Sequence, residues 1–167
     1  NSVHATGEFN QQDVENANLE VRFLRAYYYA YLIQVYGAVP LILVEVSFSA
    51  KGDFPRTPYD EIVDWLDQEL KDIASKLPLS VDDKTWYYGQ PTKGAALAVR
   101  ARVLLYAARP LFNGNADLAG LKNADGKALF NSVYNAEKWK KAVDATKELF
   151  DLGIYDLHKE YNNDGSI

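Results

Sequence analysis

The sequence predicts an all-α fold built from two helix hairpins. Apolar residues recur at helical spacing in four segments, and proline or glycine ends each segment. The first and third segments also share a short motif, which indicates an internal repeat. The 167 residues are 48% hydrophobic and 25% charged, a composition typical of one globular domain. We therefore expect residues 1–167 to form a single helical-repeat domain.

The first predicted helix runs from about Val14 to Tyr36, with Asp13 before it and Gly37 at its end. Its apolar face carries residues at i, i+3, i+4 and i+7, namely Leu24, Tyr27, Tyr28, Tyr31 and Val35. Phe23, Ala26 and Ala30 widen this face, which implies packing on both of its flanks. We expect this face to pack in the core, with the tyrosine hydroxyls reaching polar groups; a ligand platform is the alternative. Residues 39–44 then predict an extended crossing segment, because Pro40 and the lack of a second strand disfavour a sheet.

Three further helices follow from their caps and apolar stripes. The second begins with Thr57 as N-cap and Pro58 at its first position, and Pro78 ends it; its stripe is Ile62, Trp65, Leu66, Leu70, Ile73 and Leu77. Thr92 caps the third, which ends near Ala108 and has the stripe Leu97, Ala101, Leu104, Leu105 and Ala108. Asn135 caps the fourth, which Gly153 ends; its stripe is Trp139, Ala142, Val143, Leu149 and Phe150.

The loop from Leu79 to Pro91 is the best candidate for contact with a ligand. It carries an acid and three adjacent aromatic residues where no periodic structure would bury them: Asp83, Trp86, Tyr87 and Tyr88. The alternative is that these rings fold back onto the helices as a structural lid.

The internal repeat relates the first helix to the third. Arg25 matches Arg100 and Tyr31 matches Tyr106 at an interval of 75 (100 − 25; 106 − 31), while Val63 matches Val143 at 80 (143 − 63). This pattern predicts tetratricopeptide-like hairpins with long inserted loops in a right-handed α-α superhelix, because each hairpin must stack on a neighbour to bury its apolar face. Hairpin one covers about 14–78, hairpin two about 92–153, and 154–167 is an exit segment. We expect structural roles for Arg25, Arg100, Tyr31 and Tyr106, with both arginines tying stacked helices.

Composition and spacing argue against several classes of function. A net charge of −5 disfavours nucleic acid as a partner. There is no cysteine, and His4 and His158 lack partners at metal-ligand spacing, so we expect neither a metal nor a cofactor. The acids of the second helix lie at polar positions and give no sign of a catalytic pair. No segment predicts a membrane span or signal peptide, and the absence of methionine suggests a longer precursor.

One long segment supports a family resemblance. Residues 20–41 read EVRFLRAYYYAYLIQVYGAVPL, which closely resembles the ARFLRAYYYFxLVxxYGxVPL helix and exit of the SusD/RagB family. Further landmarks of that family follow in order: PRTP at 55–58, GQPTKGAA at 89–96, RARVLLY at 100–106 and YDLHKEY at 155–161. Gln90 and Pro91 stand where the family usually has Arg-Ala. The resemblance extends from about residue 15 to the end.

The resemblance implies a function at the cell surface. It implies a non-catalytic, lipid-anchored outer-membrane protein that captures oligosaccharide and delivers it to a TonB-dependent, SusC-like transporter. The family's lipid-anchor cysteine and much of its glycan platform are absent from this chain. Two other hypotheses stay open: a tetratricopeptide-type protein-interaction scaffold without sugar binding, and an α-helical glycosidase.

Overall fold

A computed structural model describes residues 10–47, 52, 54–81, 88–158 and 160. These residues form a short 3-10 turn, η1 (Ala116–Leu118), and four helices: α1 (Gln11–Tyr36), α2 (Tyr59–Lys76), α3 (Lys93–Ala108) and α4 (Glu137–Phe150). The described part of the chain contains no β-strand, only an isolated bridge between Lys122 and Ala128. The all-α prediction is confirmed.

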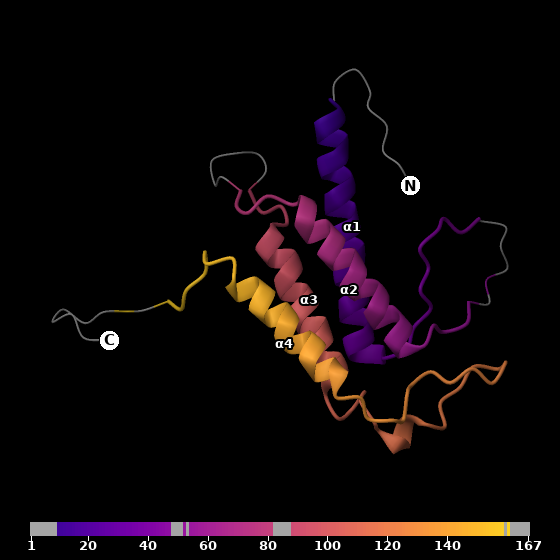
Figure 1. Cartoon of the computed structure of the whole chain (residues 1–167). Helices are drawn as coiled ribbons and strands as arrows, with labels where there is room; N and C mark the ends of the chain where they lie inside the picture. The colour runs from indigo at the N-terminus through magenta and orange to yellow at the C-terminus, as the bar shows by residue number, and fades with distance from the viewer. Residues whose placement is uncertain (1–9, 48–51, 53, 82–87, 159, 161–167) are drawn as a thin grey trace.

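Helices that follow one another in the chain run in opposite directions (Figure 1). Helix α3 packs closely against α2 and α4 and touches α1, whereas α1 packs mainly on α2. The assignment of residues 14–78 and 92–153 to two repeat hairpins stays a prediction. None of the described helices is both long and apolar enough to cross a membrane.

Helix α1 starts three residues before the position that we predicted. Asn10 and Asp13 form a capping box, in which each side chain accepts a hydrogen bond from the other residue's backbone N–H, at 3.0 and 3.1 Å. The helix ends as predicted at Gly37, whose φ is +69°. A side chain there would also collide with the ring of Phe130, so both the positive φ and the lack of space favour glycine at this position.

The predicted core face of α1 is confirmed for Ala26 and Ala30 but wrong for its bulky residues. Leu24, Tyr27, Tyr28, Tyr31 and Val35 are all exposed, and the residues that α1 buries along that stretch are Ala26, Ala30 and Ile33. Small residues face α2 because they allow the two backbones to approach closely, while the bulky tyrosines point away from the contact. Among them, Phe23 stacks on Tyr27, and Tyr27 meets Tyr28 edge to face.

The segment after α1 is extended, as predicted, and polar contacts attach it to its neighbours. The Tyr29 hydroxyl accepts a hydrogen bond from the Ile42 backbone N–H at 2.8 Å, and Thr57 N–H donates to the Val39 carbonyl at 2.9 Å. Thr57 does not cap α2, contrary to our prediction. Its hydroxyl oxygen accepts from Leu41 N–H at 3.2 Å, so it serves the crossing segment, and Pro58 occupies the N-cap position.

The stripes of α2, α3 and α4 differ in how fully they are buried. In α2, Ile62, Leu66, Leu70 and Ile73 are completely inaccessible. Thr92 caps α3 as predicted, by accepting from Ala95 N–H at 3.3 Å. The expected burial fails for Leu105 of α3 and for Trp139, Val143 and Phe150 of α4, which are exposed because no described element covers the outer side of this helix pair.

An aromatic cluster joins the start of α2 to the loop after α3. Tyr59, at the start of α2, contacts both Phe112 and Phe130, with ring centroids 4.2 and 5.7 Å away, and the two phenylalanine rings lie 5.9 Å from each other. The buried side chain of Asn113 accepts from Asn135 N–H at 2.7 Å and donates to the Asn135 carbonyl at 2.9 Å. The N-cap of α4 is Ala136, one residue after the predicted Asn135, whose side chain accepts from Glu137 N–H at 2.9 Å just before the helix.

Candidate functional site

The predicted ligand loop connects α2 to α3. Asp83, Trp86 and Tyr87 lie outside the described residues, so their contact with a ligand stays a prediction. Tyr88 is described and strongly exposed, and Gly89 follows it with a φ of +92°. The ends of the loop are fixed to each other, since Lys93 N–H donates to the Pro78 carbonyl at 2.8 Å. Tyr88 therefore projects from a loop whose base is anchored.

A cavity of about 220 Å³ lies at the base of this loop, beside the first half of α1. It is lined by residues of α1 and of both loop ends: Asn16, Leu19, Glu20, Leu77, Pro78, Ser80, Val81, Gln90 and Pro91. Gln90 closes the gap to α1, because its side-chain amide donates to the Glu20 carboxylate at 3.3 Å. The cavity thus joins the predicted ligand loop to a helix that is distant in sequence.

The lining of this cavity suits a ligand rich in hydroxyl groups. Asn16 and Gln90 each offer an amide, Glu20 a carboxylate and Ser80 a hydroxyl, and these can donate to or accept from sugar hydroxyls. The leucines and prolines beside them offer an apolar surface. The volume is below the roughly 300–1,000 Å³ of ordinary ligand pockets, so the cavity has room for only part of a long ligand.

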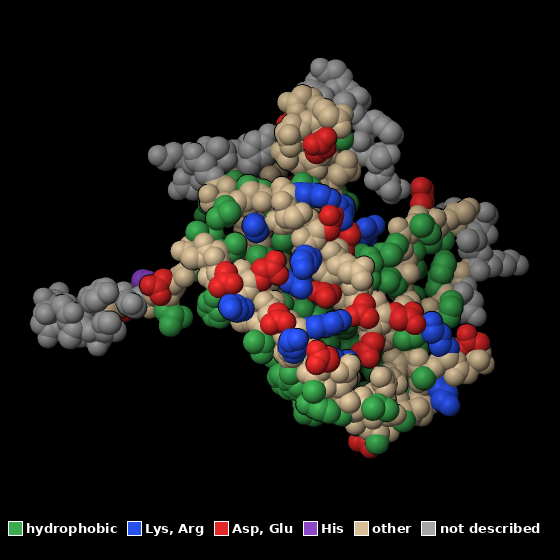
Figure 2. All heavy atoms as spheres, viewed as in Figure 1, with side chains coloured by type: hydrophobic (Ala, Val, Ile, Leu, Met, Phe, Trp, Pro, Cys, Tyr) green, Lys and Arg blue, Asp and Glu red, His purple; other side chains and the backbone are tan. Residues whose placement is uncertain are grey.

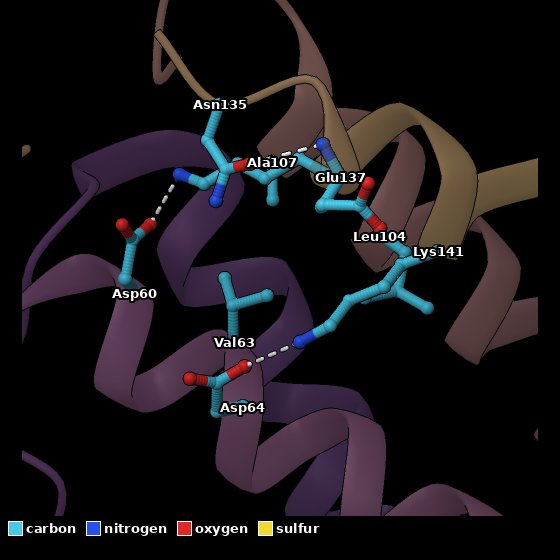
Figure 3. Close-up of a pocket in the computed structure, with 9 residues that line it drawn as sticks. Asp60, Val63, Asp64, Leu104, Ala107, Asn135, Glu137 and Lys141 are labelled. Atoms are coloured by element: carbon cyan, nitrogen blue, oxygen red, sulfur yellow. Dashed lines mark hydrogen bonds and ion pairs between the residues drawn. The ribbon is translucent and has the colours of Figure 1, made fainter. Parts of the chain in front are cut away.

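A second cavity lies between α2 and α4, above Leu104 and Ala107 of α3 (Figure 3). Its volume is about 120 Å³, and four of its charged side chains form two ion pairs. Lys138 Nζ lies 2.6 Å from Asp60 Oδ1, and Lys141 Nζ lies 3.1 Å from Asp64 Oδ1. Figure 2 shows that acidic and basic side chains alternate in a band across the face of the molecule in this view. We interpret the second cavity as a structural clamp, since a ligand would have to replace these ion pairs.

The two matched arginines make different contacts. Arg100 is buried, and its guanidinium donates to Asp67 of α2 through Nε and to Glu148 of α4 through Nη1, both at 2.6 Å. Arg25 is more exposed and donates to Glu69 of α2 at 3.3 Å. These contacts support the structural role proposed for both residues, and Arg100 joins three helices.

The two matched tyrosines also lie in different surroundings. Tyr31 is exposed on the outer face of α1, whereas Tyr106 is half-buried and carries the guanidinium of Arg109 over its ring at 3.7 Å. The contact with Arg109 supports the predicted structural role of Tyr106 on α3. Tyr31 on α1 is exposed, so its structural role stays a prediction. Helical periodicity matched the two positions but could not show which one has a neighbour.

The acids with altered pKa values do not resemble a general acid. Hydrogen bonds from Arg22 hold the pKa of Glu69 below its ordinary value, and a hydrogen bond from Lys76 does the same for Asp72. A general acid for glycoside cleavage needs the opposite shift. No group of three side chains that could hold a metal ion occurs among the described residues. In the loop after α3, the side chain of Asn115 accepts a hydrogen bond from Asp117 N–H at 3.0 Å and so forms a turn.

Sequence reasoning found the loop but missed Asn16 and Glu20. Both lie on α1 among ordinary polar positions, and the sequence contains no signal for their meeting with Gln90, 70 residues further along. The one available hint was Gln90 itself, which departs from the family pattern at this place.

Comparisons with known proteins agree with this fold. Residues 3–105 match the SusD-like family described as "Starch-binding associating with outer membrane". The solved structure of BT4246 is 31% identical, covers 90% of this chain and 27% of its own, and superposes with a TM-score of 0.83. No curated protein sequence matches the chain.

Two structures from Bacteroides fragilis NCTC 9343 show the same fold at lower identity. A SusD-like protein (BF3747) is 24% identical, with a TM-score of 0.64 over 89% of this chain and 23% of that one. A SusD-like carbohydrate binding protein (BF0978) is 21% identical, with a TM-score of 0.66 over 92% and 24%. The chain thus spans about a quarter of the length of each structure that it matches here.

Proposed function

Since the chain belongs to the SusD-like family, whose match covers more than half of it, we propose that it captures oligosaccharide at the surface of the outer membrane. In this proposal it performs no chemical conversion and delivers the sugar to a TonB-dependent, SusC-like transporter. A lipid anchor in the full-length precursor would hold it at the membrane. The observation that carries the proposal is the family match, supported by a relative that is itself described as carbohydrate binding.

The cavity at the base of the loop is the proposed contact with sugar in this part of the molecule. Tyr88 and the predicted Asp83, Trp86 and Tyr87 of the same loop would supply rings and an acid, while Asn16 and Gln90 would supply amide groups. Sugars stack their apolar faces on aromatic rings while polar side chains bond their hydroxyls. Tyr88 is exposed and precedes the lining residue Gln90 by two positions, which supports the assignment.

Calorimetric titration of the protein with maltoheptaose and a panel of other oligosaccharides tests the proposal. We expect saturable binding of at least one sugar, and a loss of about tenfold in affinity, near 1.4 kcal/mol, for Tyr88→Ala. Tyr36→Ala is the matched control, because Tyr36 is an equally exposed tyrosine at the other end of α1. If the folded protein binds no sugar, the proposed function is wrong. If both variants bind alike, only the site is wrong.

A second function, a protein-interaction scaffold without sugar binding, is favoured by the apolar outer side of α3 and α4. Two neighbouring grooves there have volumes of about 320 and 400 Å³ and include the exposed Leu105, Val143 and Phe150. Helical-repeat proteins commonly bind partners through such surfaces. Co-purification with a transporter that is unchanged by added sugar, together with an absence of sugar binding, would favour this second function.

A further inference from the structure

Glu20, on the wall of the cavity at the base of the loop, has an unusual partner. The half-buried acids of α2 and α4 each lie 2.6 or 2.7 Å from a lysine or arginine, namely Asp60, Asp67, Glu69, Asp72 and Glu148. The half-buried Asp13 caps the start of α1 instead. Among the described residues, Glu20 accepts only from the neutral amide of Gln90, at 3.3 Å. Its negative charge is therefore not balanced by a cation.

The rest of the cavity leaves this charge in place. No lysine or arginine is among the described residues that line it, and most of its walls are apolar: Leu19, Leu77, Pro78, Val81 and Pro91. Apolar walls reduce the local dielectric, so the charge of a ligand has a larger effect here than on an open surface. The second cavity differs, since Lys138 and Lys141 neutralise Asp60 and Asp64 there. The cavity beside α1 thus favours a cation and disfavours an anion.

The oxygen atoms around Glu20 suit a primary ammonium group. Asn16 and Glu20 lie one helical turn apart on the same face of α1, and Ser80 lines the cavity from the loop. Gln90 donates to Oε2 of Glu20, which leaves Oε1 without a partner among the described residues. The Asn16 amide oxygen accepts from Gln12 at 3.1 Å and keeps a second lone pair. Together these side chains offer three acceptors, and an ammonium group has three donors and no acceptor.

The neighbouring groups favour an amino sugar over the side chain of a lysine. In a sugar such as glucosamine, hydroxyl groups flank the ammonium, and the amides of Asn16 and Gln90 can bond them. A lysine side chain would place only methylene groups beside those amides and would leave them without partners. The cavity of about 220 Å³ has room for part of a sugar chain, so a single charged unit is sufficient.

We propose that the cavity at the base of the loop selects oligosaccharides that carry free amino groups, and that Glu20 determines this preference. The inference rests on the proposed function and names the class of its ligand. The ammonium of the bound sugar pairs with the Glu20 carboxylate. Acetylation of the amine removes the positive charge, and a uronic acid adds a second negative charge to the cavity, so both kinds of sugar bind more weakly.

Position 90 controls the charge of the cavity. Gln90 stands where the SusD/RagB family usually has arginine. A glutamine holds Glu20 through a hydrogen bond but leaves its charge intact. An arginine here would neutralise Glu20 through a charge-assisted hydrogen bond. The preference for an amino sugar therefore depends on both residues of the pair.

Calorimetric titration with β-1,4-linked trimers of glucosamine, glucose and N-acetylglucosamine tests the inference. The titrations are done at mildly acidic pH, where the amine is protonated, and at low ionic strength, where screening is weak. We expect the glucosamine trimer to bind about fivefold more tightly than the glucose trimer, which is the contribution of one partly screened ion pair. The acetylated trimer should bind no more tightly than the glucose trimer, and trigalacturonate should bind most weakly.

Two variants assign the preference to Glu20. Glu20→Gln should abolish it, because the amide keeps the shape of the side chain without its charge. Gln90→Arg should abolish it as well, by supplying the missing cation. Glu15→Gln is the matched control, because Glu15 is an exposed acid of α1 that does not line the cavity. This control changes the net charge by the same amount and should keep the preference of the wild type. Circular dichroism confirms that each variant is folded.

Each other result would overturn the inference. If the glucosamine trimer binds no more tightly than the glucose trimer, while some sugar of the panel binds, the cavity does not select an amine and the proposed function stands. A preference that survives in folded Glu20→Gln and Gln90→Arg would place the amine elsewhere. A preference that Glu15→Gln reduces equally would make the net charge of −5 its source. Equally tight binding of a short lysine-containing peptide would show that the ammonium alone is recognised. If no sugar binds at all, the proposed function itself is wrong.

Discussion

Helices α1 and α3 share a sequence motif, yet α3 contacts α1, α2 and α4 while α1 packs mainly on α2. Helix α3 buries nine of its 16 residues, whereas the longer α1 buries four of its 26. The motif that the two helices share sets which side is apolar, but the number of neighbouring helices sets how much of it is buried. In a repeat protein, a helix and its counterpart can therefore differ in stability although their sequences agree.

The largest difference that we predict between the two helices concerns their arginines. Arg100→Met should lower the free energy of unfolding by about 3 kcal/mol, because it leaves Asp67 without a cation in a mostly buried place. We discount the loss at Glu148, which is half exposed and can turn to water. Arg25→Met should cost less than about 1 kcal/mol, since Arg22 continues to bind Glu69 through two hydrogen bonds. Urea denaturation of both variants measures the difference.

Equal losses for Arg100→Met and Arg25→Met would show that α1 is as well supported as α3. Arg100→Lys separates charge from geometry. A lysine keeps one positive charge but cannot donate to Asp67 and Glu148 in the forked arrangement of a guanidinium. We therefore expect Arg100→Lys to lie between the wild type and Arg100→Met.

The next largest effect concerns the matched apolar positions Val103 and Tyr28. Val103→Ala should destabilise the protein by about 2 kcal/mol, because it removes buried methyl groups and leaves a cavity among α2 and α3. Tyr28→Ala should change stability by less than about 0.5 kcal/mol, since the ring is in water. Thermal unfolding of the two variants measures both. If Tyr28→Ala costs as much as Val103→Ala, the outer face of α1 is already covered in solution.

Sequence reasoning predicted the helices well and their burial poorly. Proline, glycine and capping residues are local signals, so the ends at Gly37 and Thr92 follow from the sequence. Burial depends on neighbours that periodicity does not reveal. Both Val143 of α4 and Tyr31 of α1 lie in regular apolar stripes, and both are exposed because no described element covers them. The Thr57 hydroxyl was misassigned for a similar reason, because its partner lies 16 residues away.

The candidate site, too, could be predicted from the sequence only in part. An aromatic loop between two helices is visible in the sequence, and Tyr88 is exposed as a ligand contact requires. The cavity beneath it depends on Gln90 returning to Glu20 across 70 residues. No local pattern encodes that return, because the loop ends are brought together by the packing of α2 against α3.

The smallest predicted effect is a dependence on pH that belongs to hairpin one. Hydrogen bonds from Arg22 lower the pKa of Glu69 below its ordinary value of 4.5. Between the lowered pKa and 4.5 the unfolded chain binds more protons than the folded one, so the free energy of unfolding rises with pH in that window. The stabilisation is complete above pH 4.5 and is lost as the pH falls through the folded-state pKa.

Glu69→Gln should therefore flatten the fall in Tm that the wild type shows on acidification below pH 4.5, while Asp72→Asn, at a more exposed position, should flatten it less. Thermal unfolding across a pH series measures both slopes.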